Sequence, residues 1–541
     1  MASEQPQKTI PLRIFVDREN NKVVVVESTK DFVDTLFSFL SLPLATIIRL
    51  LTTNNEQQQQ QSNNDEESSP SSSSFLGNIK NLYESVQNLT PNDVWNPVCK
   101  QMLLNPKNPC ESLCTKLFLN IDDTDMSSKF FVCDSCNKFT TFQNLDCTCG
   151  KPINRQPKNL DSEGQGSGGS VHASNGVFVK ENGSLFLVFD DLKIVPSSMV
   201  TSMQLLTELG YSDLTQLEEV THNIGKQEIL NLLKYTLTSH EPLTNTILKS
   251  SSKNKDKSPN QFASAVRVKA CTCDIKMDVK LVRSKSQKKI IFAEASENFV
   301  DFMFSFLTIP LGSVVKVLDG NSFVGCVDNL YKSVENLDSS RCTDSRSVLL
   351  NPGVAPQFGC PNQPLNIPHV QTPATTYYYG TGTLKQERDN RYSSVYYNTI
   401  VVPVVEGVIS KTTGSVSNAK ALTAMDPRSP NKSIKDVMGF VKRPALYGVG
   451  DDLQVKSLSA NSCLAYLKEF SFPLDDLEVK AISIGEAEAL SILAASLTSK
   501  STLTSGLEDF FNVPKQDSNL TSKYIQTSRL DELAKEPKPE N

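Results

Sequence analysis

The segment ESTKDFVDTLFSFLSLPLATIIRLL, residues 27–51, returns as EASENFVDFMFSFLTIPLGSVVKVL at residues 294–318. The two segments align without a gap at an offset of 267 residues. In each, an apolar run ends at a proline, Pro43 or Pro310, and a second apolar run with helical spacing follows. Proline cannot continue a helix but is tolerated where one begins. Each segment therefore predicts two short helices that meet at the proline.

Further blocks repeat in the same order along the chain. They are NLYESVQNL from Asn81 and NLYKSVENL from Asn329, LLNP at 103–106 and 349–352, DDLKI from Asp190 and DDLQV from Asp451, and IGKQEILNLLKYTLTSHEPLT from Ile224 and IGEAEALSILAASLTSKSTLT from Ile484. Collinear repeats of this kind indicate a tandem duplication. A period near 260 residues is far too long for a solenoid repeat.

The blocks define the expected domain organisation. Copy one covers residues 8–250 and copy two covers residues 264–515, with a linker at 251–261 and a polar tail at 516–541. The offset falls from 267 to 248 after the first block, so copy one carries 19 extra residues there. These lie within residues 52–74, a Gln/Asn/Ser tract whose composition predicts a disordered insert.

A second polar stretch, residues 161–176, predicts a flexible Ser/Gly joint within copy one. It contains Gly164-x-Gly166-x-x-Gly169, which matches the dinucleotide-binding fingerprint as a string. That fingerprint needs a preceding strand and a following helix, and none is predicted here. A linker is therefore favoured over a pyrophosphate site.

The patterning within each copy predicts the α+β class. LRIFVDRENNKVVVVES, residues 12–28, has β-branched runs around a polar turn and predicts an N-terminal β-hairpin. Helices should follow, the first capped by Thr29 or its counterpart Ser296. SLFLVFDDLKIV, residues 184–195, predicts a later strand that leads into two C-terminal helices. The expected order is thus strands first and helices after them, with a zinc-ribbon-like insert in copy one.

Length and charge limit the class of protein. A chain of 541 residues suggests about three or four folding units. The net charge of -6 is too small to indicate an acidic tail or a nucleic-acid-coating protein. The most apolar run, residues 37–48, is shorter than the roughly twenty residues of a bilayer span. No secretory signal is recognisable, so we expect a cytoplasmic or nuclear protein with reduced or metal-bound cysteines and no membrane partner.

The repeated blocks resemble a known family. FVDTLFSFLSLPL, NLYESV, LLNP, CDSC followed by CTCG, DDLKI and EILNLLKYTLTSHEPLT are similar to the plant domain-of-unknown-function family numbered 674. The resemblance extends over nearly the whole chain, and members of that family carry such copies singly or in tandem. It implies no activity and no catalytic residues.

The stretch VCDSCNKFTTFQNLDCTCGKP, residues 132–152, is the strongest candidate for a chemical site. It contains Cys133-x-x-Cys136 and, ten residues later, Cys147-x-Cys149-Gly150. Zinc takes four soft ligands in a tetrahedron, and two short cysteine turns facing each other supply them. The sequence therefore predicts one structural zinc site within the segment 129–155, with Lys138, Lys151 and Arg155 offsetting the thiolate charge.

Other interpretations of these cysteines stay open. The four could be reduced structural thiols, Cys133 and Cys136 could form a redox pair, or Cys110 and Cys114 could compete as ligands. The corresponding part of copy two, residues 375–398, has no Cys or His. Any metal site is thus confined to copy one, which argues for a structural role and against a reaction shared by both copies.

Function is less constrained by the sequence than fold is. Five acidic positions recur in both copies, and we expect them to be caps, turn formers and solvated residues; they are Glu27/Glu294, Asp34/Asp301, Asp190/Asp451, Asp191/Asp452 and Glu228/Glu488. The leading hypothesis is a non-enzymatic scaffold or interaction protein with a protein partner. One alternative is nucleic-acid binding through the basic segment 249–289 and the zinc module, and another is an enzyme with an unrecognised carboxylate site.

Overall fold

The computed structural model describes residues 8–61, 76–124, 130–133, 135–153, 155–156, 158–159, 176–180, 185–248, 275–343, 346–370, 375–388, 391–405, 408–409, 414–458, 468 and 473–511. We refer to residues 8–248 as the N-terminal half and to residues 275–511 as the C-terminal half. The predicted joint (except Gly176), the linker and the tail lie outside the described residues. So does the Gly164-x-Gly166-x-x-Gly169 string.

Each half contains one five-stranded sheet. The N-terminal sheet has the order β7-β6-β2-β1-β8 and the C-terminal sheet the order β17-β16-β10-β9-β18. The strands of the first are β1 (Thr9–Asp17), β2 (Lys22–Ser28), β6 (Phe186–Phe189), β7 (Ile194–Pro196) and β8 (Leu217–Gly225). Those of the second are β9 (Met277–Ser284), β10 (Ile290–Ser296), β16 (Leu446–Gly450), β17 (Val455–Leu458) and β18 (Leu477–Ile484). Every neighbouring pair is antiparallel, and the two orders match strand for strand.

The expectation that helices follow the later strand is only partly correct. The opening hairpins β1–β2 and β9–β10 form as predicted, but the sequence pattern does not predict β8 and β18, which complete the sheets from late in each half. Only Ile224 of β8 is fully buried. The strand pairs along its whole length with β1 and with no other strand, so it lies at the sheet edge. An edge strand of this kind lacks the apolar alternation by which strands are recognised in a sequence.

The helices divide at the two prolines as predicted. In the N-terminal half, α1 (Lys30–Ser38) passes through a short 3-10 turn, η1 (Phe39–Ser41), before α2 (Leu44–Gln61). The C-terminal half repeats this as α9 (Glu297–Ser305), η4 (Phe306–Thr308) and α10 (Leu311–Val317). Thr29 and Ser296 occupy the N-cap positions, but neither side chain makes a capping hydrogen bond. The predicted cap positions are therefore confirmed, and the predicted capping interaction is wrong.

Part of the predicted disordered insert is helical. Helix α2 continues to Gln61, so residues 52–61 are helical, and residues 62–74 lie outside the described part of the chain. The counterpart α10 is followed by Asp319 and Gly320, both of which have positive φ. In α2, the buried Asn54 instead donates to Asn231 Oδ1 at 3.0 Å. Glutamine has a good helix propensity, and a helix already nucleated and anchored extends at little cost.

The two halves meet first at the prolines. Pro43 and Pro310 form an antiparallel bridge, in which Leu44 N donates to Ile309 O at 3.1 Å and Leu311 N donates to Leu42 O at 3.0 Å. The repeated segments thus lie against each other about an approximate two-fold axis. The proline that directly precedes the second helix of each half is thus also the residue that joins the halves.

Two amphipathic helices cross between the halves. α3 (Ile79–Asn88) packs on α9 and β17 of the C-terminal half, whereas α11 (Val327–Asn336) packs on α1 and β7 of the N-terminal half. Ser85 Oγ accepts from Val455 N, and Ser333 Oγ accepts from Ile194 N, both at 2.9 Å. One helix of each half therefore packs against the sheet of the other half.

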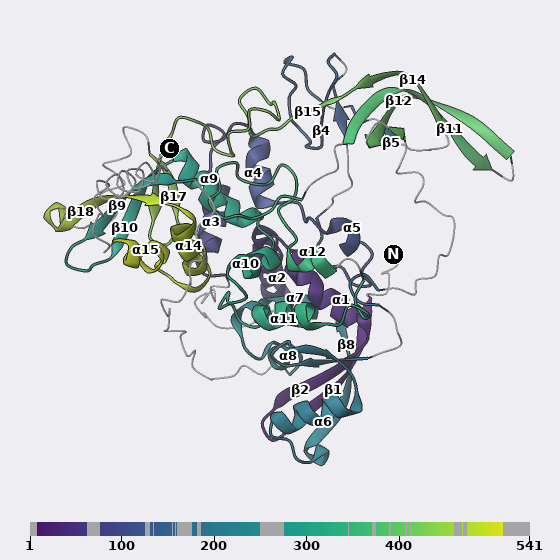
Figure 1. The fold of residues 1–541 in the computed structure, drawn as a ribbon, viewed down its shortest axis with the longest axis vertical. Coiled ribbons are helices and arrows are strands. Elements are labelled where there is room, and N and C mark those ends of the chain that lie inside the picture. The colour runs from purple at the N-terminus through teal and green to yellow at the C-terminus, as the bar shows by residue number, and fades with distance from the viewer. Residues whose placement is uncertain are drawn as a thin grey trace, which may run out of the picture.

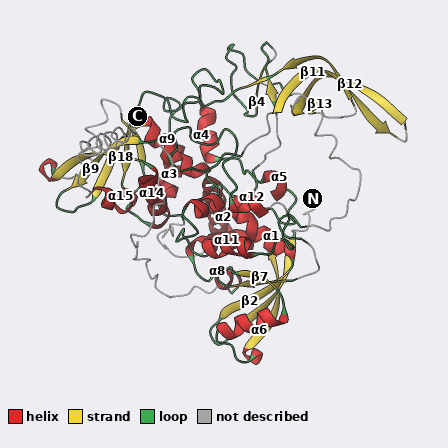
Figure 2. Ribbon diagram, viewed as in Figure 1, coloured by secondary structure: helices red, strands yellow, loops and turns green. Residues whose placement is uncertain are grey.

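One large hydrophobic cluster extends through both halves and only three small ones, of three buried residues each, accompany it, so the described residues do not divide into the several large cores expected from chain length. Helices gather between the two sheets, which lie at separate ends of the molecule (Figures 1 and 2). The remaining helices are α4 (Pro97–Leu104), α5 (Glu111–Cys114), α6 (Met199–Glu208), α7 (Lys226–Thr238), α8 (Pro242–Ile247), α12 (Arg346–Leu350), α14 (Glu486–Thr498) and α15 (Thr502–Phe511). The α+β class is confirmed.

A third sheet lies beyond the helices. It contains β11 (Thr375–Arg388), β12 (Arg391–Val405), β13 (Val408–Ile409) and β14 (Gly414–Ala421), with β5 (Lys158–Asn159) added alongside β12. Long strands β11 and β12 form a hairpin that projects from the body (Figure 1). Among the described helices, none is both long enough and apolar enough to span a bilayer.

Candidate metal centre

The four predicted ligands converge. The Sγ atoms of Cys133, Cys136, Cys147 and Cys149 all lie within 4.8 Å of one another. Cys133 Sγ lies 3.5 Å from Cys136 Sγ and 3.6 Å from Cys149 Sγ, and Cys136 Sγ lies 3.3 Å from Cys147 Sγ. The cluster is half enclosed, since Cys133 and Cys147 are buried and Cys149 is exposed.

Two tight turns bring the thiols together. After the short strand β3 (Phe131–Val132), Cys133 N donates to Lys138 O at 3.0 Å and Lys138 N donates to Cys136 O at 2.7 Å. The second turn is closed by Cys147 N, which donates to Lys151 O at 2.9 Å, and by Gly150 N, which donates to Cys147 O at 2.9 Å. Gly150 has φ +81°, a conformation that glycine adopts without strain. Gly150 thus lets the chain turn directly after the second cysteine pair without strain.

The arrangement fits a tetrahedral metal ion with thiolate ligands. Zinc–sulfur bonds of about 2.3 Å place the sulfurs of a tetrahedral site about 3.8 Å apart. The sulfur separations of 3.3 to 3.6 Å are close to that value, so an ion at the centre needs only small adjustments. Zinc is compatible with this donor set, and it would supply structural cross-linking, because four cysteine ligands leave no open position for water.

The electrostatics of the cluster are uneven. The backbone N–H of Lys151 donates to Cys149 and lowers the pKa of that thiol to about 6. Hydrogen bonds with the neighbouring sulfurs raise the pKa of Cys136. The two lysines predicted to offset thiolate charge lie at the rim, where Lys138 Nζ donates to Thr148 Oγ1 at 2.5 Å and Lys151 Nζ donates to Ser135 Oγ at 2.7 Å. They brace the two turns without contacting sulfur directly.

The segment that carries the four cysteines, residues 129–155, is called the cysteine module below. It also contacts the C-terminal half. Strand β15 (Thr423–Ala424) pairs in parallel with β4 (Lys138–Thr140) of the module, and Met425 N donates to Phe139 O at 2.9 Å. Lys432 Nζ donates to Asp146 O at 2.7 Å. The two segments lie side by side in Figure 1. A chain segment nearly 300 residues away thus completes the sheet of the module. Nothing in the sequence signals this contact, because residues 422–433 contain neither Cys nor His.

The competing cysteine pair lies elsewhere. Cys110 and Cys114 are buried near Ser41, whose Oγ lies 3.5 Å from Cys114 Sγ, and neither belongs to the cluster. Burial raises the pKa of Cys114 to about 11, so this thiol stays protonated at neutral pH. In the C-terminal half, residues 375–398 lie mainly in the hairpin strands β11 and β12.

The repeated acids make matching structural contacts in the two halves. Oδ1 of Asp34 accepts from the N–H groups of Phe178 and Val179, and Oδ1 of Asp301 accepts from those of Phe440 and Val441, at 2.8 to 3.0 Å. Both aspartates therefore hold a returning loop, which is a structural role, but they are buried and not the solvated residues that the sequence predicts.

The other recurrent acids behave in the same way. Glu27 and Glu294 accept hydrogen bonds from Arg13 and Lys280, and Glu228 and Glu488 accept from the backbone N–H groups of Gly225 and Gly485. Asp190 and Asp451 accept from Thr244 and Thr504. The backbone carbonyls of Asp191 and Asp452 accept from the side-chain amides of Asn329 and Asn81. One pair, Asp190 and Asp191, does line a cavity of about 460 Å³. That is the one arrangement among the described residues that favours the carboxylate-enzyme alternative.

In the described part of the basic segment, residues 275–289, three of the six lysines and arginines lie beside carboxylates and a fourth donates to a backbone carbonyl. Lys280 Nζ lies 2.8 Å from Glu294 Oε1, and Lys289 Nζ lies 3.5 Å from Asp451 Oδ2. Arg283 Nη1 lies 3.8 Å from Glu478 Oε1, and Lys285 Nζ donates to Asp475 O at 2.7 Å. Residues 249–274 lie outside the described chain. The described cations therefore stabilise the C-terminal sheet.

Comparison with known proteins gives one match. A family model described as "Protein of unknown function (DUF674)" matches residues 6–487. No curated protein matches the chain. No solved structure matches it either.

Proposed function

The chain belongs to the DUF674 family, and within it we propose that the protein is a non-catalytic scaffold whose two halves are held in one arrangement by a structural zinc module. The observation that carries this proposal is the cysteine cluster together with β15. The four thiols enclose an ion-sized space, and the strand that completes their sheet comes from the other half. Zinc bound there would fix residues of both halves at once.

A non-catalytic role is supported by how the recurrent acids are used. Asp34 and Asp301 hold equivalent loops, and Asp190 and Asp451 accept from equivalent threonines. A carboxylate whose lone pairs are taken by fixed donors is poorly placed to accept a substrate proton. We also infer that the halves are copies of one unit, which is supported by their matching strand orders and reciprocal contacts.

The proposed partner is another protein, and the proposed location is the cytoplasm or nucleus, since thiolate ligands require a reducing compartment. Such a scaffold would act through the surfaces that its rigid halves present. Nucleic-acid binding has less support, because four of the six lysines and arginines of residues 275–289 contact acidic residues or a carbonyl. A salt-dependent mobility shift on generic DNA or RNA, abolished when Lys285, Lys288 and Lys289 become Glu, would favour that alternative instead.

The test combines metal analysis with hydrogen exchange. Purified wild-type protein should contain about one zinc per chain, and Cys133→Ser/Cys136→Ser should contain none. In the variant, amide exchange should accelerate in β4 and also in β15, residues 423–424, while β1 and β9 stay protected. Cys114→Ser is the matched control, since this thiol is buried among polar neighbours outside the cluster, and it should retain the metal.

Two results would contradict the proposal. If wild-type protein prepared under reducing conditions contained no metal, the proposed zinc site would be wrong. Acceleration limited to β4, with β15 unchanged, would leave a metal site but would show that it does not join the halves.

A further inference from the structure

The N-terminal half contains a cavity of about 460 Å³ between its sheet and the C-terminal end of α6. Its apolar wall consists of Val24, Phe189, Leu205 and Leu209. Charged and polar side chains from the sheet, from α6 and from the loops complete the lining, among them Lys22, Asp190, Asp191, Lys193, Glu208 and Tyr211. A cavity of this volume, mainly apolar with a few polar groups, suits a small organic molecule.

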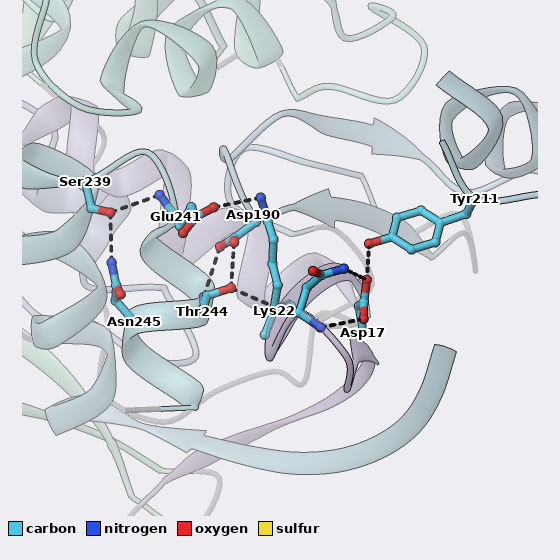
Figure 3. Close-up of polar contacts among 10 residues, drawn as sticks. Asp17, Lys22, Asp190, Tyr211, Ser239, Glu241, Thr244 and Asn245 are labelled. Carbon is cyan, nitrogen blue, oxygen red and sulfur yellow. Dashed lines mark hydrogen bonds and ion pairs between the residues drawn. The ribbon is translucent and has the colours of Figure 1, made fainter. Parts of the chain in front are cut away.

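The polar groups form two networks around the sheet edge (Figure 3). In one, Asp190 accepts from Thr244 N at 2.9 Å and from Thr244 Oγ1 at 2.6 Å. Lys22 Nζ turns to Glu241 Oε1 at 2.8 Å. In the other, the Tyr211 hydroxyl donates to Asp17 Oδ2 at 2.9 Å. Asp190 is therefore buried with neutral donors on its oxygens, and the nearby ammonium is bound to a different carboxylate.

The C-terminal half arranges the same groups differently. Asp451 accepts from Thr504 N at 2.7 Å and from Thr504 Oγ1 at 3.0 Å, as Asp190 does from Thr244. Here, however, Lys289 Nζ lies 3.5 Å from Asp451 Oδ2. Lys22 and Lys289 occupy the same position in the repeated sequence. The lysine thus reaches the aspartate in one half and not in the other.

One residue accounts for the difference. Glu241 N donates to Ser239 Oγ at 3.0 Å, and Ser501 N donates to Ser499 Oγ at 3.0 Å, so Glu241 and Ser501 are equivalent. The serine carries no charge and leaves Lys289 beside Asp451. The glutamate attracts Lys22 away from Asp190. The two halves therefore differ by a carboxylate in place of a hydroxyl beside the cavity.

The charge balance of the cavity favours a cation. Three carboxylates line it, those of Asp190, Asp191 and Glu208, against the ammonium groups of Lys22 and Lys193 and the imidazole of His240. Lys22 is already paired with Glu241. Burial raises the pKa of Asp190 to about 6, although the hydrogen bonds from Thr244 and the charge of Lys22 oppose that shift. Because an uncompensated buried charge is costly, an added positive group beside Asp190 would be stabilising.

We propose that this cavity binds a small organic amine, with its ammonium group beside Asp190 and its apolar body against Phe189, Leu205 and Leu209. The ligand would supply to Asp190 the positive charge that Lys289 supplies to Asp451. This inference goes beyond the scaffold function and requires no catalytic step. Its test is independent of the metal site, so either proposal can fail alone.

The first arm of the experiment compares two probes of the same shape. Titration calorimetry on the full chain would use 2-phenylethylamine and 3-phenylpropionate, which share a phenylethyl body and carry opposite charges. The amine should bind saturably, and the acid should bind at least about tenfold more weakly. Equal binding of the two probes, or no saturable binding of the amine, would overturn the proposal.

The second arm changes the residue that distinguishes the halves. Glu241→Ser gives the cavity the residue of the C-terminal half, so Lys22 should move to Asp190 and amine affinity should fall at least about tenfold. Glu218→Ser is the matched control, because it removes the same charge from the same half at a residue paired with Arg18 outside the cavity. Both variants should unfold cooperatively. Unchanged amine affinity in Glu241→Ser, or an equal loss in Glu218→Ser, would contradict the proposed site.

Discussion

Asp34 in the N-terminal half and Asp301 in the C-terminal half each hold a returning loop, yet the second carboxylate oxygen of each accepts from a different kind of donor. Oδ2 of Asp34 accepts from Val177 N at 2.7 Å, whereas Oδ2 of Asp301 accepts from Arg443 Nη2 at 3.1 Å. In the C-terminal half, Gly439 lies at the position of Val177, and a Cβ there would come within 1.7 Å of Asp301 Oδ2. Both halves thus have the contact between the aspartate and its loop, but a backbone amide donates to Asp34 Oδ2 where an arginine donates to Asp301 Oδ2.

The same division holds for the rest of the molecule. Some contacts that join the halves are reciprocal, as at Pro43 and Pro310 or at Ser85 and Ser333, whereas the pairing of β15 with β4 is one-sided. Elements at the periphery differ, since one half carries the cysteine module and the other the long β11–β12 hairpin. A contact that two halves share can change only if both sides change together. A peripheral loop has no such restriction, and that is where the halves differ.

The largest effect is expected at Arg443. Arg443→Met leaves the buried Asp301 without its cation, and losing one partner of a buried ion pair costs about 3–5 kcal/mol of unfolding free energy. No side-chain substitution can do the same to Asp34, whose third donor is a backbone amide. Chemical denaturation of the single variants and of Arg443→Met/Asp301→Asn measures the coupling. If the arginine substitution costs as much in the Asp301→Asn background as in the wild type, the proposed charge compensation is wrong.

Two glycines test whether the halves are equivalent where they cross. Gly77 and Gly325 have φ of +51° and +46°, and an added Cβ would lie 2.4 Å from Ser496 O and 2.2 Å from Thr236 O. Gly77→Ala and Gly325→Ala should each destabilise the protein by about 2–4 kcal/mol, from left-handed strain and backbone crowding. The denaturation midpoints of the two variants should agree closely. A large loss for one and none for the other would show that the crossing is not reciprocal.

The smallest effect concerns pH. Burial raises the pKa of Asp190 to about 6, against about 3.9 for an unfolded chain. A carboxyl with a raised folded-state pKa contributes most stability below the unfolded value, and that contribution is lost as the pH rises from about 4 through about 6. The loss is at most about 3 kcal/mol between pH 4 and pH 7. Asp190→Asn should flatten this part of the profile.

The matched variant in the other half is Asp451→Asn. Burial raises the pKa of Asp451 as well, but Lys289 opposes the shift at 3.5 Å, so the flattening should be smaller. The measurement is the unfolding free energy at several pH values for both variants. Equal slopes would indicate that Lys22 compensates Asp190 as well as Lys289 compensates Asp451, which would also weaken the amine proposal.

Local features were predictable because short-range chemistry specifies them. The opening hairpins follow from β-branched runs around a polar turn, and the helix breaks follow from Pro43 and Pro310. The cysteine cluster follows from spacing, since two tight turns with paired thiols have few ways to satisfy one ion. The helices at Ile79–Asn88 and Val327–Asn336 follow from the spacing of their apolar residues.

The tertiary structure decided what those elements contact. An amphipathic pattern requires that α3 and α11 be covered, but either sheet offers an equivalent apolar face, so the sequence cannot say that the helices cross between halves. The edge strands β8 and β18 depend on pairing more than on side-chain burial. The pairing of β15 with the cysteine module joins residues nearly 300 positions apart through backbone groups that every sequence carries. The sequence by itself thus determined the opening hairpins, the helices around the prolines and the candidate metal ligands. Long-range packing determined the edge strands and which half each of these elements contacts.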